Sequence, residues 1–178
     1  MSTATATPEA QIVTLSIDRE VFGVPVAAVL EILDMRPMFR LPEAPQYLAG
    51  LIDVRGRGVP VIDLRTKLGL PATAVTENTR VLVLDVRVGD RQLILGLIAD
   101  RVIEVIALNS ADIEPAPEIG LRWNSDYING VGRHNDSFVI IFDLARLFST
   151  EEAMLLDTAR AESDGKIGKS SAIGQNAA

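Results

Sequence analysis

The sequence predicts a mainly β protein made of two small β-barrels or sandwiches packed together. Short runs rich in Val, Ile and Leu alternate with glycine-bearing turns along most of the 178 residues, which is typical of many short strands. One pattern of residues occurs twice, 80 positions apart. Aromatic residues make up only 4% of the chain, so the cores are expected to be aliphatic.

The repeat indicates two similar subdomains, at about residues 12–69 and 81–148. Two copies are too few for a solenoid, which needs at least three repeats to bury a continuous core. A unit of about 60 residues hides only about 60% of its unfolded surface, so the two copies are expected to stabilise each other. A duplicated scaffold of this kind favours a connector over a catalyst. The aligned pairs are Tyr47–Leu51 with Tyr127–Val131, Val59–Leu64 with Val139–Leu144, and Gly23–Ile32 with Gly96–Val105.

The first copy begins with a strand at Ile12–Ile17, followed by a polar turn. Apolar residues between Val26 and Leu33 fall at the spacing of a short helix, with a strand as the alternative. Three prolines in Met35–Pro45 predict a surface loop. A hairpin then turns at Arg55–Gly58, where glycines permit positive φ.

Both hairpins of the repeat lead into a short helical turn. Asp63 is expected to cap the first turn, which Gly69 closes, and Asp143 occupies the same place in the second copy. Between the copies, a polar linker at 71–79 precedes another hairpin, formed by Val81–Val88 and Gln92–Ile98.

The chain ends are expected to lie outside the folded domain. Residues 1–11 form a Ser/Thr/Ala-rich arm, and residues 163–178 form a Gly/Ser/Ala-rich tail. Ser149 and Glu152 have the spacing of a capping box, which predicts a C-terminal helix at about 150–162.

Composition restricts the partners and the compartment. A net charge of −7 and a pI near 4.7 argue against binding nucleic acid. The absence of cysteine excludes disulfides and thiolate metal sites, and no segment resembles a signal peptide or a membrane span, so a cytoplasmic location without membrane insertion is expected. A basic cluster could meet an acidic protein surface, although a solvated rim is its commoner meaning; its members are Arg55, Arg57, Arg65, Lys67 and Arg80.

No residue pattern predicts catalysis, a metal or a cofactor. His134 is the single histidine and lies in a polar hairpin turn without a nucleophile motif nearby. Asp63 and Asp143 are better explained as helix caps than as an acid–base pair. Gly56 and Gly58 precede a strand instead of the helix that a phosphate-binding loop requires.

Five motifs in a fixed order carry a family resemblance. They are Gly23 with Val29–Ile32, then Gly50–Gly56, Val59–Arg65, Ile113–Glu118 and Tyr127–Gly130. Together they resemble the CheW family of bacterial chemotaxis coupling proteins over residues 12 to about 160. The resemblance implies one CheW-like domain at 12–162, with two packed five-stranded SH3-like β-barrels, short helices and the C-terminal helix.

The same resemblance implies a function and partners. Family members are non-catalytic adaptors, use no cofactor, and bind the regulatory domain of the histidine kinase CheA and the cytoplasmic tip of methyl-accepting chemotaxis receptors. The expected location is therefore the receptor array on the inner face of the membrane. Two alternatives remain open: a small-molecule-binding double barrel, and a coupling protein of a non-chemotactic array.

The resemblance also implies a receptor-binding set. Arg55 and Gly56 match the Arg-Gly of the family's Asn-Leu-Arg-Gly motif, in which Asp53-Val54 replaces Asn-Leu and exchanges an amide for an acid. No kinase-binding residue is assigned. The other members of the receptor-binding set are Val29, Glu31, Gly50, Val102 and Val105.

Overall fold

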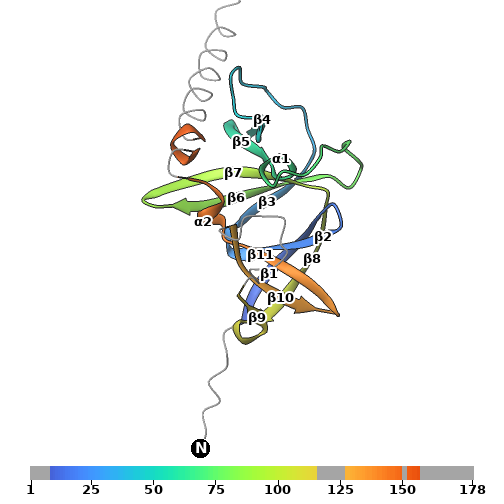
Figure 1. Cartoon of the computed structure of the whole chain (residues 1–178). Helices are drawn as coiled ribbons and strands as arrows, with labels where there is room; N and C mark the ends of the chain where they lie inside the picture. Colours follow the sequence, from blue (N-terminus) through green and yellow to red (C-terminus); the bar gives the residue numbers. More distant parts are fainter. Residues whose placement is uncertain (1–8, 116–126, 150–151, 157–178) are drawn as a thin grey trace, which may run out of the picture.

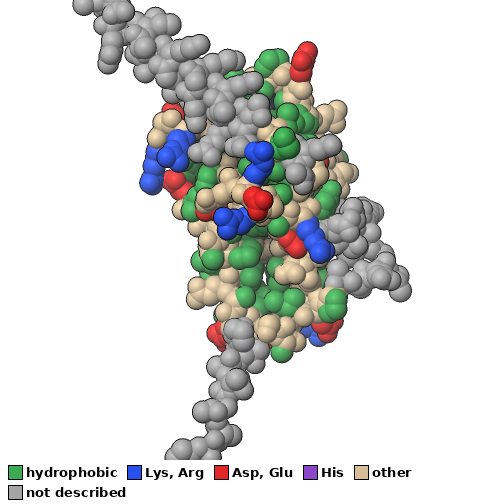
Figure 2. All heavy atoms as spheres, turned by 90° about the vertical axis from the view of Figure 1, so that its left-hand side faces the viewer, with side chains coloured by type: hydrophobic (Ala, Val, Ile, Leu, Met, Phe, Trp, Pro, Cys, Tyr) green, Lys and Arg blue, Asp and Glu red, His purple; other side chains and the backbone are tan. Residues whose placement is uncertain are grey.

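The computed structural model describes residues 9–115, 127–149 and 152–156, and its core consists of two β-sheets curled into two barrels (Figure 1). The barrel built from residues 9–25, 101–114 and 128–142, called barrel A, lies below the barrel built from residues 29–99, called barrel B, in that view. The C-terminal helical residues 152–156 lie beside barrel B. On the face shown in Figure 2, most charged side chains lie on the upper half of the molecule, and hydrophobic side chains are common on the lower half.

Barrel A is a six-stranded sheet with the order β8-β1-β2-β11-β10-β9. Its sixth member, β9, has only two residues, so the predicted five-stranded pattern is present with one short addition. The strand bounds are β1 Glu9–Ile17, β2 Glu20–Pro25, β8 Arg101–Asn109, β9 Ile113–Glu114, β10 Ile128–His134 and β11 Ser137–Phe142.

Barrel B is a five-stranded sheet with the order β3-β6-β7-β5-β4. Short helices connect the strands of both barrels. The strand bounds are β3 Val29–Asp34, β4 Leu48–Val54, β5 Arg57–Asp63, β6 Arg80–Val88 and β7 Arg91–Ala99. The helices are η1 Val26–Ala28, α1 Leu64–Lys67, η2 Ser110–Asp112 and α2 Leu144–Leu147.

The two barrels have the same internal topology, but they are not the contiguous subdomains 12–69 and 81–148 predicted from the repeat. The order β3-β6-β7-β5-β4 corresponds strand by strand to β8-β1-β2-β11-β10. The chain leaves barrel A after β2, completes barrel B, and returns at β8. Parallel pairing of β11 with β2 then closes barrel A, just as β5 pairs with β7 in barrel B. The repeat is therefore real, but each sheet takes strands from both copies.

Two repeat-related glycines sit where these parallel pairs form. Gly23 lies opposite Ile141, and Gly96 lies opposite Val61. A Cβ on Gly23 would lie 2.5 Å from Cγ2 of Ile12, and one on Gly96 would lie 2.8 Å from Cγ1 of Val81. Close strand packing inside each barrel therefore explains why both copies keep glycine here.

The largest hydrophobic core lies between the barrels. Phe22 and Phe142 of barrel A belong to it, together with Leu82, Leu84 and Leu97 of barrel B. Two smaller cores fill the barrel interiors; the core of barrel B comprises Leu33, Ile52, Val59, Val61, Val81 and Val83, and the core of barrel A comprises Ile12, Ile106, Leu108, Val139 and Ile141. The shared core fits the expectation that the two repeat units stabilise each other.

Most local predictions agree with the structure, and two boundaries differ. Residues 29–34 form a strand, because their backbone pairs with β6, so the helix predicted across Val26–Leu33 is limited to η1. The predicted arm 1–11 overlaps β1, which begins at Glu9 opposite Asn109. The tail 163–178 and most of the predicted helix 150–162 lie outside the described residues, apart from 152–156, which are helical.

The predicted helix caps are confirmed. Oδ1 of Asp63 accepts a hydrogen bond from the Arg65 amide at 3.0 Å, and Oδ1 of Asp143 accepts one from the Arg146 amide at 3.3 Å. Within the described ranges, no helix has the length and apolar character needed to cross a membrane.

Candidate functional site

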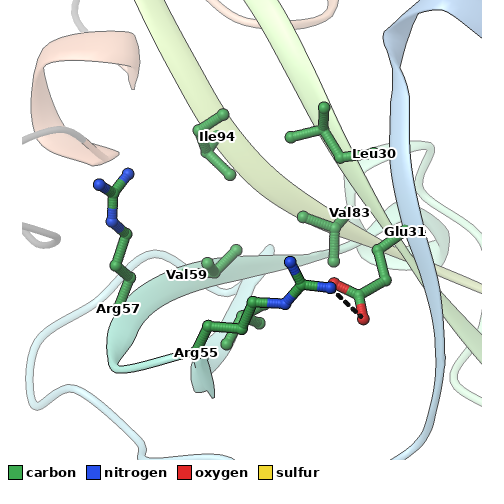
Figure 3. A pocket seen from close by; sticks show the side chains of 8 residues that line it. Leu30, Glu31, Arg55, Arg57, Val59, Val83 and Ile94 are labelled. Carbon is green, nitrogen blue, oxygen red and sulfur yellow. Dashed lines mark ion pairs between the residues drawn. The ribbon is translucent and has the colours of Figure 1, made fainter.

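A hollow of about 390 Å³ opens at one end of barrel B (Figure 3). Its apolar wall comes from Val59 on β5, Val83 on β6 and Ile94 on β7. Charged side chains from β3 and the β4–β5 hairpin stand at its rim. The full lining is Leu30, Glu31, Val54, Arg55, Arg57, Val59, Val83 and Ile94.

Arg55 and Glu31 face each other across this rim (Figure 3). Nη2 of Arg55 lies 3.9 Å from Oε1 of Glu31, and the two side chains are 84% and 34% exposed. An exposed pair at this distance contributes at most about 1 kcal/mol. The guanidinium group is therefore available to a second carboxylate.

The β4–β5 turn holds the backbone at Arg55 in a defined conformation. Arg55 and Gly56 have φ values of 55° and 82°, and the Gly56 amide donates to Oδ1 of Asp53 at 2.8 Å. An asparagine side-chain oxygen accepts the same kind of bond. Asp53 therefore preserves the turn where the family motif has asparagine, and the substitution adds a negative charge beside Arg55.

The other predicted receptor-binding residues divide between the two barrels. Val29 on β3 and Val102 on β8 are repeat partners, and both pack against the shared core. Val105 is 59% exposed on β8, and its repeat partner Ile32 is 43% exposed on β3. The structure thus brings Glu31 and Arg55 together at the mouth of barrel B, with Gly56 next to Arg55 in the turn, while Val102 and Val105 lie on barrel A and do not line the hollow.

Gly50, which the resemblance also places in the receptor-binding set, is buried beneath a loop. A Cβ at this position would lie 2.8 Å from the carbonyl oxygen of Phe39, and Phe39 forms a two-way backbone bridge with Leu51. The obstructing atom belongs to the backbone, so it cannot rotate away. The structure therefore gives Gly50 a packing role.

Gly50→Ala is expected to lower the free energy of unfolding by about 2 kcal/mol, because the added methyl group forces the 39–51 bridge apart. Chemical denaturation monitored by circular dichroism measures this change. An unchanged midpoint would show that the loop yields without cost. Any loss of receptor binding would then have to come from direct contact at Gly50.

Two largely buried basic side chains on α1, Arg65 and Lys67, have specific ion-pair partners that the sequence does not predict. Arg65 joins Asp100 through two hydrogen bonds, from Nε to Oδ1 at 3.2 Å and from Nη2 to Oδ2 at 2.5 Å. Nζ of Lys67 forms an ion pair with Glu152. The sequence showed both residues only as members of a basic cluster, and their partners are 35 and 85 residues away.

His134 occupies a position in barrel A that resembles the position of Arg55 in barrel B. Its Nε2 lies 3.5 Å from Oε1 of Glu104, which is the repeat partner of Glu31. The side chain is 33% exposed at the end of β10, where the sequence predicted a hairpin turn. Each barrel therefore brings a carboxylate on its edge strand close to a basic side chain on its hairpin.

The comparison with protein families matches this architecture. The model of the CheW-like domain matches residues 11–152. The chain belongs to the CheW-like family. This membership confirms the predicted fold and the predicted class of function, a scaffold of chemotaxis signalling.

Individual CheW proteins are similar over most of their length. The chemotaxis protein CheW of Helicobacter pylori is 35% identical over 141 residues, covering 79% of this chain and 82% of the relative. The chemotaxis protein CheW of Klebsiella aerogenes is 32% identical over 142 residues, covering 80% and 83%. The crystal structure of the scaffolding protein TtCheW from Thermoanaerobacter tengcongensis superposes with a TM-score of 0.75 at 27% identity, covering 88% of this chain and 99% of that one.

Proposed function

We propose that this CheW-like chain is a non-catalytic adaptor that couples methyl-accepting chemotaxis receptors to the histidine kinase CheA. In this role it binds the regulatory domain of the kinase and the cytoplasmic tip of the receptor, at arrays on the inner face of the membrane. The observation that carries the proposal is the charged, apolar-walled mouth of barrel B within a CheW-like fold.

The chemistry of this mouth suits a helical protein segment. Leu30 is 55% exposed and lies beside the apolar wall, which offers a surface for the apolar face of a helix. Arg55 and Arg57 at the rim can each bind a carboxylate on that helix, and a guanidinium does so with two parallel hydrogen bonds. Ile32 is a further exposed apolar residue on β3, the strand that carries Leu30 and Glu31.

Titration calorimetry of the purified chain with the regulatory domain of CheA from the same organism tests the kinase half of the proposal. Saturable binding at a 1:1 ratio is the expected result. A folded chain that gives no heat of binding at high concentration would refute this half. The receptor half is tested separately with a soluble receptor-tip fragment.

Arg55→Glu is expected to weaken binding to the receptor fragment by about tenfold, or about 1.4 kcal/mol. The change removes a rim cation and places a second carboxylate beside Glu31. Because Arg55 is 84% exposed, the melting temperature should not change. Arg87→Glu, on an exposed position of β6 outside the mouth, makes the same charge reversal and should leave affinity unchanged.

Equal affinities for Arg55→Glu and the unmodified chain would remove Arg55 from the receptor surface. Equal losses in Arg55→Glu and Arg87→Glu would show a general effect of net charge. Only a loss confined to Arg55→Glu supports a specific contact at the mouth of barrel B.

A small-molecule ligand is the second candidate, because the hollow has a volume within the usual range of about 300–1,000 Å³ for ligand pockets. Thermal melting in the presence of a metabolite set distinguishes this candidate. A ligand that raises the melting temperature of the unmodified chain, and not that of Arg55→Glu, would favour it.

A further inference from the structure

Lys67 is the last residue of α1, and little of its side chain is exposed to solvent. Its side chain is 7% exposed, and Nζ forms an ion pair with Glu152. Three aromatic rings also surround Nζ, all within the distance of about 6 Å at which a cation and a ring face attract. The ring centroids lie 4.5 Å away for Tyr47, 5.5 Å for Phe148 and 5.9 Å for Tyr127.

Two of these rings are repeat partners from different barrels. Tyr47 precedes β4 of barrel B, and its carbonyl oxygen accepts the Asp63 amide at 2.8 Å. Tyr127 precedes β10 of barrel A, and its carbonyl oxygen accepts the Asp143 amide at 2.9 Å. The backbone beside each ring is thus fixed to a helix cap next to its own barrel, and Lys67 contacts both rings.

The arrangement is not repeated in the second copy. The position 80 residues after Lys67 is Leu147, which is fully buried. Among the described residues, one cation, Lys67, therefore contacts both related tyrosines. Its carboxylate partner comes from a third element, the helical residues 152–156, whose Ala153 and Leu156 are buried in the shared core.

We propose that Lys67 is a positioning residue that fixes the orientation of the two barrels and of the C-terminal helix relative to one another. A largely buried ammonium group loses favourable contacts when either ring or the carboxylate moves, and leaving it without its partner is costly. An apolar side chain of the same length fills the space without this directional attraction. The charge of Lys67, rather than its volume, adds a preferred orientation of the three elements to the packing of the shared core.

The state of Tyr47 is consistent with this role. Burial, followed by the negative charge of Glu152, raises the pKa of Tyr47 to about 12. The phenol is therefore neutral at physiological pH, and among the described residues around Lys67 the anionic partner is Glu152.

The orientation of the barrels matters for the adaptor because the predicted receptor-binding residues lie on both. Val29 and Glu31 belong to β3 of barrel B, whereas Val102 and Val105 belong to β8 of barrel A. This consequence rests on the proposed function. The structural role of Lys67 does not.

The absence of cysteine makes a direct distance measurement straightforward. Arg87→Cys on β6 and Ala107→Cys on β8 place one spin label on an exposed position of each barrel. Pulsed electron spin resonance then gives the distribution of distances between the barrels. The same double-labelled protein carries Lys67→Met, Lys67→Arg, or the control Leu147→Met, which makes the same exchange to methionine at the repeat-related position.

Lys67→Met is expected to broaden or shift the distance distribution while the far-ultraviolet circular dichroism stays unchanged. Lys67→Arg restores a cation and should return the distribution towards that of the unmodified chain, and Leu147→Met should leave it unchanged. A distribution in Lys67→Met that matches the unmodified chain overturns the proposal. Equal broadening in Lys67→Met and Leu147→Met also overturns it, because packing alone would then explain the result.

If Lys67→Met does not fold, Glu152→Gln takes its place with labels at Arg87→Cys and Leu155→Cys. Leu155 is 44% exposed on the C-terminal helix, so this pair measures how firmly that helix is held. Broadening supports the proposal, and an unchanged distribution overturns it.

Receptor binding separates this inference from the proposed function. Lys67→Met is expected to lower the affinity for the receptor-tip fragment by about fivefold, although Lys67 itself is not on the surface. If the unmodified chain does not bind the fragment, the proposed function fails and the distance measurement still decides the role of Lys67. If receptor affinity is unchanged despite a broadened distribution, the link between barrel orientation and binding fails.

Discussion

Phe22→Ala is expected to lower the free energy of unfolding by about 4 kcal/mol. Phe22 is fully buried in the core shared by the two barrels, and its ring stacks on Phe142 with centroids 4.7 Å apart and planes 3° from parallel. Removing the ring leaves a cavity in the shared core, next to β2 and β11, the parallel pair that closes barrel A. The stack itself adds about 0.5–1.5 kcal/mol beyond the buried area.

Such a loss is a large part of the stability of 5–15 kcal/mol that is typical of a domain. Thermal unfolding should show a fall in the melting temperature of roughly 10 °C, at about 2–4 °C for each kcal/mol in a chain of this size. Phe138→Ala is the matched control, because this ring lies on the same strand β11 but is 62% exposed. It should cost less than about 1 kcal/mol. Similar losses for both variants would contradict the central place of the shared core.

Arg65→Ala is expected to cost about 3 kcal/mol, because it leaves the carboxylate of Asp100 without its guanidinium partner. The Arg65 side chain is 11% exposed, and that of Asp100 is 26% exposed. Asp100 also accepts the Asp18 amide at 2.7 Å, and the Asp18 carboxylate lies 3.7 Å from Arg65. The cluster joins the β1–β2 turn of barrel A to α1 and the β7–β8 connection, so its loss loosens both barrels.

The same cluster predicts how the effect of Arg65→Ala depends on pH. Burial raises the pKa of the Asp100 carboxyl, but the hydrogen bonds from Arg65 and the Asp18 amide, with the charge of Arg65, outweigh burial and leave it below 3.8. A folded-state pKa below the unfolded value means that ionised Asp100 stabilises the protein above pH 3.8 and that this contribution is lost as the pH falls through the lowered folded value.

Urea denaturation at a series of pH values measures this dependence. The gap in unfolding free energy between Arg65→Ala and the unmodified chain should be constant near neutral pH and should narrow as the medium becomes acidic. Arg146→Ala, whose side chain is 70% exposed, is the control and should cost at most about 0.5 kcal/mol. A gap that widens in acid would show that Asp100 is not the partner that matters.

Local chemistry made much of the fold predictable. Turns and caps depend on a few neighbouring residues, so Gly56 in the hairpin turn and Asp63 at its helix cap could be read directly from the sequence. The repeat indicated two similar units because buried positions with the same neighbours keep the same residue types. Gly23 and Gly96 are the clearest case.

Features that depend on distant pairing were not predictable in the same way. No local pattern shows that β2 pairs with β11, so the repeat in the sequence predicts two contiguous subdomains where the structure has exchanged strands. The spacing of Val26 to Leu33 fits a helix face, and pairing with β6 overrides it. The Lys67 site joins residues from positions 47 to 152, and only the folded chain brings them together.

The family resemblance predicts the residues of the candidate site, and the structure places only some of them at the mouth of barrel B. Glu31 and Arg55 meet at the mouth of barrel B, while Gly50 is held by packing against Phe39. Their roles in binding remain predictions. Arg57 and Ile94 also line this mouth, although neither belongs to a family motif. The sequence does not predict their place there, because it depends on how the barrel brings β5 and β7 together.

The path of the chain through the two barrels sets an order for folding. Barrel B is one uninterrupted stretch, from β3 to β7, whereas barrel A needs strands from both ends of the chain. During synthesis, the β1–β2 hairpin is therefore made first. The edge of β2 that pairs with β11 has no partner until β11 has been made. Contacts between such distant segments form slowly, and an unpaired strand edge invites association with other chains. A nascent or truncated chain that ends before β10 therefore contains all five strands of barrel B but lacks two strands of barrel A, and the edge of β2 has no partner until β11 is made.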